Sequence, residues 1–234
     1  MTTKKRIILV LLSVVLLSLG WLGASGISLL VALVPLLILS EHYSASTKDF
    51  WRMAAWGALT FILWHAATVW WVWIATPIGP IAAGAFGTFW NLVALMTYHY
   101  VSKRAPRALA YTLLVALWLT TESLYNSAEV LTFPWLLLGH GFSNDIWAVQ
   151  WYEFTGTLGG SLWIWACNLG IFGLLVSLSD GSWSGFNIKA KAASCIGLLT
   201  LFILPPVVSG AIGKQYENAM EADESLEVLI IQPN

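Results

Sequence analysis

Four polar residues whose side chains could bind a ligand or a proton lie within long apolar runs of this sequence: His65, Asn91, Glu122 and Asn168. A polar group is costly in hydrocarbon unless it faces the interior of a helix bundle. There it either forms a hydrogen bond between helices or takes part in a functional site. No Lys or Arg lies deep in any of these runs, so the pattern argues against an ion pathway built on a buried cation.

Glu122 is the first residue of a polar stripe near one end of its run. The stripe has the spacing i, i+3, i+4 and i+7 of a single helical face and consists of Glu122, Tyr125, Asn126 and Glu129. We expect Glu122 to face the protein interior, within reach of the segment that follows. Two interpretations stay open: a solvated helix end, or a face turned toward a polar lipid head group or a further domain.

The segment 129–160 is the longest one between apolar runs, and long connections of this kind tend to be functional. Its Pro and Gly residues favour turns, and its aromatic residues suit a membrane interface. With Glu122 and Asn168, its candidate docking residues are Phe133, Pro134, Trp135, His140, Trp151 and Glu153. His140, Ser143 and Asp145 have the residue types of a hydrolytic triad, but three neighbours in one loop rarely converge, so we assign none.

The two cysteines, Cys167 and Cys195, both fall in apolar runs. A nucleophilic thiol needs a base or cation to activate it, and no such group is close in sequence. Nothing resembles paired Cys and His ligands at zinc spacing. We therefore expect no disulfide, no metal site, no cofactor and no catalytic residue in this chain.

Composition places the chain in a membrane. It is 58% hydrophobic and 10% charged, with a mean hydropathy of +0.75, whereas about a quarter of the residues of a soluble domain carry charge. The net charge of −1 offers no case for nucleic acid as a partner. We predict an all-α, polytopic membrane helix bundle.

About 20 apolar residues are needed to cross the hydrocarbon. Seven candidate spans result: 7–22, 27–39, 53–75, 81–100, 108–127, 161–179 and 192–208. The first two are short and fit either a tilted pair or a re-entrant hairpin joined at 23–26. Lys4 to Arg6 followed by an apolar run also has the form of a signal peptide, with Ala24 near the cleavage position.

Charge predicts the orientation. With seven spans and a cytoplasmic N-terminus, only Lys214 of the eleven Lys and Arg residues falls outside the cytoplasm. This asymmetry follows the positive-inside rule. It predicts a multi-pass protein of the bacterial cytoplasmic membrane with its C-terminus in the periplasm.

The chain ends on sequence of a different kind. We divide it into a transmembrane domain at 1–212, an acidic periplasmic linker at 213–225 and a strand at 226–234. The β-branched and aliphatic run Val228 to Ile231, followed by Pro233, is typical of the first buried strand of a soluble α/β domain. We expect the rest of that domain to lie beyond Asn234.

These features together resemble the membrane domain of bacterial apolipoprotein N-acyltransferases, in the version found on the Bacteroidetes side of that family. The likeness covers mainly residues 115–234. It rests on four elements in order: Trp118 with Glu122, the 133–136 turn followed by Gly139, the 150–160 segment leading to Asn168, and the strand at 228–232. One departure is that many members carry an Arg shortly after the Glu, where this chain has Tyr125 and Asn126.

The resemblance implies a function. A nitrilase-like domain with a Glu, Lys and Cys triad would take an acyl chain from a phospholipid as a thioester and pass it to the α-amino group of a diacylglyceryl-cysteine of an apolipoprotein. That triad would lie after residue 234, in the same protein or in a separately encoded partner. This chain would then supply lipid and lipoprotein docking and be inactive alone. The alternatives are a non-catalytic membrane scaffold for a periplasmic partner and a small transporter; the lack of internal repeats argues against the transporter.

Overall fold

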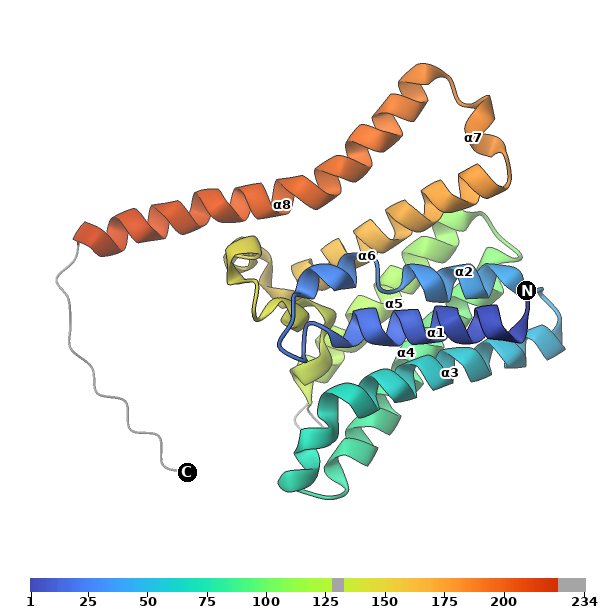
Figure 1. The fold of residues 1–234 in the computed structure, drawn as a ribbon, viewed down its shortest axis with the longest axis horizontal. Coiled ribbons are helices and arrows are strands. Elements are labelled where there is room, and N and C mark those ends of the chain that lie inside the picture. The colour runs from blue at the N-terminus through green and yellow to red at the C-terminus, as the bar shows by residue number, and fades with distance from the viewer. Residues whose placement is uncertain (128–132, 223–234) are drawn as a thin grey trace.

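The computed structural model describes residues 1–127 and 133–222, which form helices and turns without a strand. Within these residues the α-helices are α1 (Thr3–Ser18), α2 (Val34–His42), α3 (Thr47–Val69), α4 (Gly79–Ser102), α5 (Arg107–Ser127), α6 (Tyr152–Ser179), α7 (Ser182–Gly185) and α8 (Ile188–Ala222). Short 3-10 helices occupy the connections: η1 (Gly26–Leu30), η2 (Trp70–Ile74), η3 (Pro134–Leu136), η4 (Leu138–Phe142) and η5 (Ile146–Ala148). The predicted all-α helix bundle is thereby confirmed (Figure 1). The strand expected at 226–234 lies outside the described residues.

Five of the described helical segments are long and apolar enough to cross a membrane: Thr47–Ile74, Gly79–Ser102, Arg107–Tyr125, Tyr152–Ser179 and Ile188–Asn218. The first two predicted spans correspond to shorter pieces. α1 has 16 residues, and at 1.5 Å per residue it covers about 24 Å, less than the hydrocarbon thickness. α1 packs against α2 and α3, and η1 and α2 run back beside it (Figure 1).

An aromatic column joins α3, α5 and α6 in the core. The Trp118 ring on α5 lies 5.9 Å from the Phe61 ring and 5.0 Å from the Trp165 ring, and all three side chains are buried. Large rings packed edge to face fix the rotation of each helix, because few other rotations fill the same space. This column sets which face of α5 turns inward, one helical turn before Glu122.

Ion pairs tie several helices together at one end of the bundle. Lys103 Nζ lies 2.9 Å from a Glu41 carboxylate oxygen, and an Arg107 nitrogen lies 3.0 Å from the other oxygen. Arg107 also lies 3.7 Å from Asp180 at the end of α6. Hydrogen bonds from Ser182, together with the Arg107 guanidinium, hold the pKa of Asp180 below its ordinary value. We call this end of the bundle, with the ion pairs of Glu41, Lys103, Arg107 and Asp180, the cationic end.

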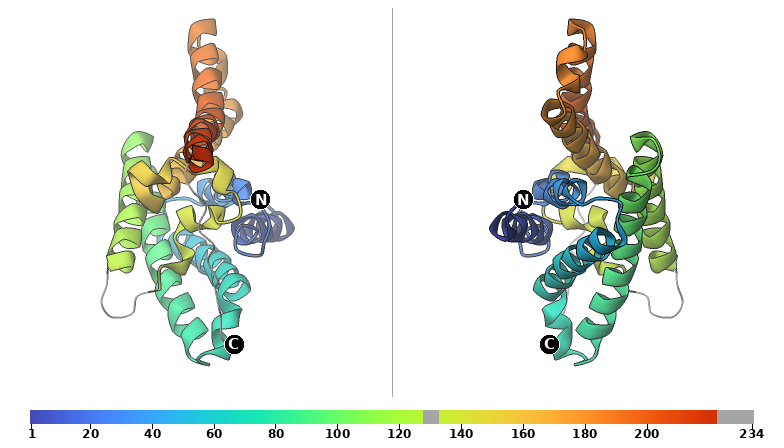
Figure 2. Two further views of the ribbon diagram at one scale, coloured as in Figure 1. Left: turned by 90° about the vertical axis from the view of Figure 1, so that its left-hand side faces the viewer. Right: turned by 90° about the vertical axis from the view of Figure 1, so that its right-hand side faces the viewer.

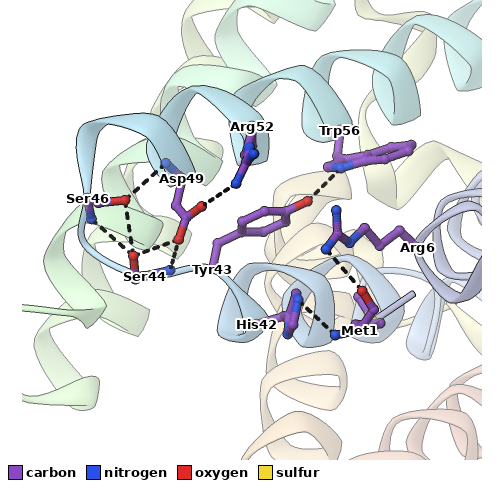
Figure 3. A network of polar contacts seen from close by, with 9 residues as sticks. All are labelled: Met1, Arg6, His42, Tyr43, Ser44, Ser46, Asp49, Arg52 and Trp56. Carbon is purple, nitrogen blue, oxygen red and sulfur yellow. Dashed lines mark hydrogen bonds and ion pairs between the residues drawn. The ribbon is translucent and has the colours of Figure 1, made fainter. Parts of the chain in front are cut away.

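The N-terminus belongs to the same end. The Met1 amino group lies 3.2 Å from His42 Nε2, and the Arg6 guanidinium stands 5.4 Å from the centre of the Tyr43 ring (Figure 3). Near the start of α3, the Asp49 carboxylate accepts hydrogen bonds from the Ser44 amide and hydroxyl, and the Asp49 amide donates to the Ser46 hydroxyl (Figure 3). The start of α1, the end of α2 and the start of α3 therefore meet there.

α8 lies at the margin of the bundle, on α6 and η5 (Figures 1 and 2). It contains Pro205 and Pro206. A proline has no backbone N–H, so the Leu201 carbonyl, four residues before Pro205, has no helical donor. Trp163 Nε1 on α6 donates to this carbonyl at 2.6 Å. α8 continues to Ala222, so the first ten residues of the predicted linker are helical.

Candidate functional site

The opposite end of the bundle is covered by residues 133–149. Trp21 Nε1, after α1, donates to the Trp135 carbonyl at 2.9 Å. The Asp145 carboxylate accepts from the Gly26 amide at 2.6 Å and from the Ser25 hydroxyl at 3.0 Å. These bonds hold the segment against the start of η1, so it lies across the bundle end.

The same bonds decide the question of a triad. His140 Nδ1 lies 2.8 Å from the Pro134 carbonyl oxygen, which accepts its proton. The Asp145 carboxylate instead accepts its hydrogen bonds from Ser25 and Gly26, at the start of η1. Among the described residues no side-chain hydrogen bond joins His140, Ser143 and Asp145, so the structure does not assemble them into a hydrolytic triad.

Glu122 faces the protein interior, which confirms the expectation from the sequence. Its side chain is buried, and Oε1 accepts hydrogen bonds from Trp118 Nε1 at 3.0 Å and from the Leu138 amide at 2.9 Å. The second bond joins α5 to the segment 133–149, as predicted. Within the described residues, Oε2 has no hydrogen-bond partner. One carboxylate oxygen thus joins α5 to the segment 133–149, and the other is buried.

A cavity beside Glu122 unites three of the four polar residues found within apolar runs. His65 reaches it from α3, Asn91 from α4 and Glu122 from α5. We call it the polar cavity. Its lining is His65, Ala83, Phe86, Gly87, Trp90, Asn91, Thr121, Glu122, Tyr125, Phe133, Leu136 and Leu137. Tyr125 shares the cavity with Glu122, as expected for the polar stripe; the Asn126 side chain and Glu129 lie outside what the structure describes.

His65 is held in one orientation. Nδ1 lies 2.6 Å from the Phe61 carbonyl oxygen of the preceding turn and 3.4 Å from the Thr88 hydroxyl. A carbonyl only accepts, so the proton is on Nδ1 and Nε2 of the neutral ring is an acceptor. A Cβ at position 87 would overlap Nε2. Gly87 therefore makes the space that the imidazole occupies.

A second, largely apolar hollow lies on the other side of the segment 133–140. We call it the outer groove. Its lining is Trp21, Pro134, Trp135, Gly139, His140, Phe142, Ser143, Ile146, Val149, Tyr152 and Thr157. Of the predicted docking residues, Phe133 and Glu122 line the polar cavity, whereas Pro134, Trp135 and His140 line the outer groove.

Three predicted docking residues lie elsewhere. Asn168 is fully buried; its Oδ1 accepts from the Leu33 and Val34 amides, and its Nδ2 donates to two carbonyls. Trp151 packs against the Trp163 ring at 5.8 Å. Glu153 accepts a hydrogen bond from the Tyr216 hydroxyl of α8. Their observed contacts hold the fold together, and their role in docking stays a prediction.

Some features of the site were not visible in the sequence. The aromatic wall of the polar cavity, Phe86 and Trp90, carries no motif of its own. The Leu138 amide that binds Glu122 belongs to the backbone, and side-chain patterns do not reveal it. The spacing of Trp118 four residues before Glu122 is the one local signal, because such residues meet on a helix.

The described residues contain no group of three or more His, Cys, Asp or Glu that could hold a metal ion. Cys167 is buried in α6 with its sulfur 3.8 Å from the Leu201 carbonyl oxygen, and Cys195 is exposed on α8. Neither thiol lines the polar cavity or the outer groove.

The five apolar helical segments make this chain a multi-pass membrane protein of the helix-bundle class. Residues 8–170 match the family model of the apolipoprotein N-acyltransferase N-terminal domain. That match extends over more than half of the chain, and the chain belongs to this acyltransferase family.

A curated relative agrees with this assignment. Over 139 residues the chain is 32% identical to the apolipoprotein N-acyltransferase of Chlorobaculum tepidum. The aligned part is 59% of this chain and 25% of the relative, so the chain matches about a quarter of that protein's length. No solved structure matches the chain.

Proposed function

We propose that this chain is the membrane part of an apolipoprotein N-acyltransferase and that its loop-covered end binds the two lipid substrates. The acyl donor would be a phospholipid and the acceptor the diacylglyceryl-cysteine of an apolipoprotein. The family assignment supports the reaction type.

One observation carries the assignment of the site. The segment 133–140 stands as a common wall between the polar cavity and the outer groove, with Phe133 on one side and Trp135 on the other. Two hollows beside one wall, at one end of a membrane bundle, suit two amphiphiles whose reacting carbons must be brought to the same place. In this proposal the wall positions both.

The acyl-transfer step itself would use a nitrilase-like domain, in continuation or as a separate partner. Acyl transfer through a thioester needs a thiolate, a group that activates it and donors for the oxyanion. The Cys167 thiol is enclosed by packing, and the Cys195 thiol lies on the outer face of α8. Both thiols lie away from the two hollows, so we assign neither as nucleophile.

The orientation follows from charge. The cationic end would face the cytoplasm, because Lys and Arg residues collect on that side of bacterial inner-membrane proteins. The polar cavity and the outer groove would then open near the periplasmic surface, where lipoproteins receive their acyl chains in this family.

Cross-linking with a photoreactive phospholipid in nanodiscs tests the site. We expect cross-links on residues that line the polar cavity, mapped by mass spectrometry of the digested chain. Gly87→Leu should reduce them about tenfold, since even its Cβ would overlap His65 Nε2. Gly173→Leu is the matched control, because nothing lies within 4 Å of a Cβ at that helical glycine. Cross-links confined to the outer face of α8, or equal in both variants, would refute the proposed site.

A further inference from the structure

We infer that a phospholipid with an anionic head group binds in a groove between α6, α7 and α8, with Lys189 and Lys191 beside its negative charge. This lipid would be structural and would belong to the cytoplasmic leaflet. The inference takes only the orientation of the bundle from the proposed function. It concerns the cationic end, where α7 joins α6 to α8 (Figure 1).

The first observation is the groove itself, which we call the α8 groove. Its volume is about 350 Å³, which is within the range of ligand sites. It is lined by apolar and small residues: Gly170, Gly173, Leu174, Ser177, Trp183, Phe186, Ala193, Ser194, Gly197, Leu198 and Leu201. Nothing lies within 4 Å of a Cβ at Gly173 on α6 or at Gly197 on α8. This space suits an acyl chain better than a helix, which is about 10 Å across with its side chains.

The second observation is the sparse packing of α8. Only 6% of its most apolar stretch is buried among the described residues. Its contacts with α6 include the Trp163 indole on the Leu201 carbonyl and the Leu198 side chain beside Gly170. Both contacts lie farther from the cationic end than Gly197 does. An acyl chain in the α8 groove would supply the dispersion contacts that are missing between the two helices.

The third observation is the charge at the mouth of the α8 groove. Ala193 lies four residues after Lys189, Ser194 lies three residues after Lys191, and both line the groove. Residues at these spacings share a helical face, and side chains on a helix lean toward its N-terminus. The two ammonium groups therefore extend the groove toward the cationic end. Basic pockets between membrane helices on the cytoplasmic side bind anionic head groups.

These lysines have no counter-ion in the part of the chain that the structure describes, where no carboxylate lies within ion-pair distance of either one. Asp180, at the end of α6, is paired with Arg107 at 3.7 Å. The N-terminal end of α8 adds a partial positive charge of its own. An anionic phospholipid would supply the counter-charge and fill the apolar groove at the same time.

Native mass spectrometry of the purified chain tests the role of the charge. The chain is offered equal amounts of phosphatidylglycerol and phosphatidylcholine with identical acyl chains. The variant is Lys189→Gln/Lys191→Gln. Lys4→Gln/Lys5→Gln is the matched control, because it removes the same charge from exposed residues of α1 at the same end of the bundle.

We expect the unmodified chain to retain phosphatidylglycerol at least about tenfold over phosphatidylcholine, since two lysines near the membrane surface each attract an anionic lipid. Lys189→Gln/Lys191→Gln should abolish this preference, and Lys4→Gln/Lys5→Gln should keep it. Equal retention of the two lipids by the unmodified chain overturns the inference and needs no variant to fold. A preference that both double variants keep, or that both lose, overturns it as well.

A glycine substitution tests the groove. Gly197→Leu should lower the retention of phosphatidylglycerol about tenfold, because the new side chain occupies the space of the acyl chain. Gly210→Leu is the matched control: it makes the same change on α8 outside the groove, at a Cβ that likewise has nothing within 4 Å. Equal retention by the two variants would mean that a protein segment, not a lipid, fills the groove, and the inference fails. Either failure leaves the cross-linking test of the polar cavity, and so the proposed function, untouched.

Discussion

Glu122 and Asn168 are two buried polar residues whose hydrogen bonding separates a site residue from a structural one. Asn168 makes four hydrogen bonds, two from its oxygen and two from its nitrogen, and so uses all its polar capacity within the fold. Glu122 binds Trp118 and the Leu138 amide through Oε1, and its side chain borders the polar cavity. Side chains of the second kind are the ones that a ligand can reach.

Replacement of Asn168 should therefore act on stability. Asn168→Leu removes the acceptor for the Leu33 and Val34 amides at the start of α2, leaving two buried donors unpaired. We expect a loss of about 2 kcal/mol or more in the free energy of unfolding, measured by denaturation in detergent. Asn144→Leu, which removes one exposed hydrogen bond to Ala24, should change it by less than about 0.5 kcal/mol. Equal effects of the two substitutions would contradict this role for Asn168.

At the scale of elements, the bundle depends on side chains that form hydrogen bonds with backbone groups lacking a partner within their own helix. The prolines of α8 leave the Leu201 carbonyl without a helical donor, and Trp163 of α6 supplies one. At the start of η1, the Asp145 carboxylate supplies an acceptor for the Gly26 amide. In a membrane such substitutes matter more than in water, because no solvent is there to bond the free groups.

A double-mutant cycle tests the contact between α6 and α8. Trp163→Phe should cost roughly 1 kcal/mol beyond lost packing, because the Leu201 carbonyl loses the indole donor and keeps only the weak Cys167 thiol. Pro205→Ala restores an N–H that can bond that carbonyl, so Trp163→Phe should cost less in the Pro205→Ala background. The measurement is unfolding of the four proteins in the same detergent. Additive effects would show that the indole does not substitute for the N–H that Pro205 lacks.

At the scale of the whole molecule, the two ends of the bundle differ in chemistry. One carries the ion pairs of Glu41, Lys103 and Arg107. The other carries the polar cavity and the outer groove, with exposed aromatic side chains such as Trp135 and Trp147 beside them. In the proposed orientation, this division would place both hollows on the periplasmic side.

Cysteine labelling tests that direction. In a chain whose own cysteines are replaced by alanine, Asn144→Cys lies at the loop-covered end and Ser184→Cys lies in α7, next to the cationic end. A membrane-impermeant thiol reagent applied to spheroplasts should label Asn144→Cys at once and Ser184→Cys only after permeabilisation. The reverse pattern would overturn the orientation and the periplasmic opening of the cavities.

Acyl transfer tests the division of labour between this chain and a nitrilase-like domain. Cys167 and Cys195 lack the surroundings that thioester chemistry needs, so the chain alone should add no acyl group to a diacylated lipopeptide. The expected readout is an unchanged mass of the lipopeptide after incubation with phospholipid. Adding a nitrilase-like domain of the family that associates with the chain should restore the mass shift. Transfer by the chain alone, abolished by Cys167→Ser, would mean that the active site lies within the bundle.

The sequence by itself determined the class of protein, because hydrophobic length and charge are local properties. Apolar runs predicted the long helices: α4 and α5 agree with the predicted spans 81–100 and 108–127 to within about two residues, whereas α8 continues to Ala222, well past the predicted end at 208. The pattern was less informative for the first two runs, where α1 and α2 are short, and for the start of α6. There Gly156, at φ 64°, has a non-helical backbone that kinks α6 near its start, and hydropathy cannot detect this kink.

The tertiary structure alone decided which polar residues act together. His65, Asn91 and Glu122 lie far apart in sequence, and whether they meet depends on how α3, α4 and α5 are rotated about their axes. Core packing such as the Phe61, Trp118 and Trp165 column sets that rotation, and packing is a property of contacts between distant segments. The same contacts assigned Asn168 to the core and brought Glu122 to the border of the polar cavity. A sequence names the polar groups in a membrane helix, but only the neighbours of each group determine whether a ligand can reach it.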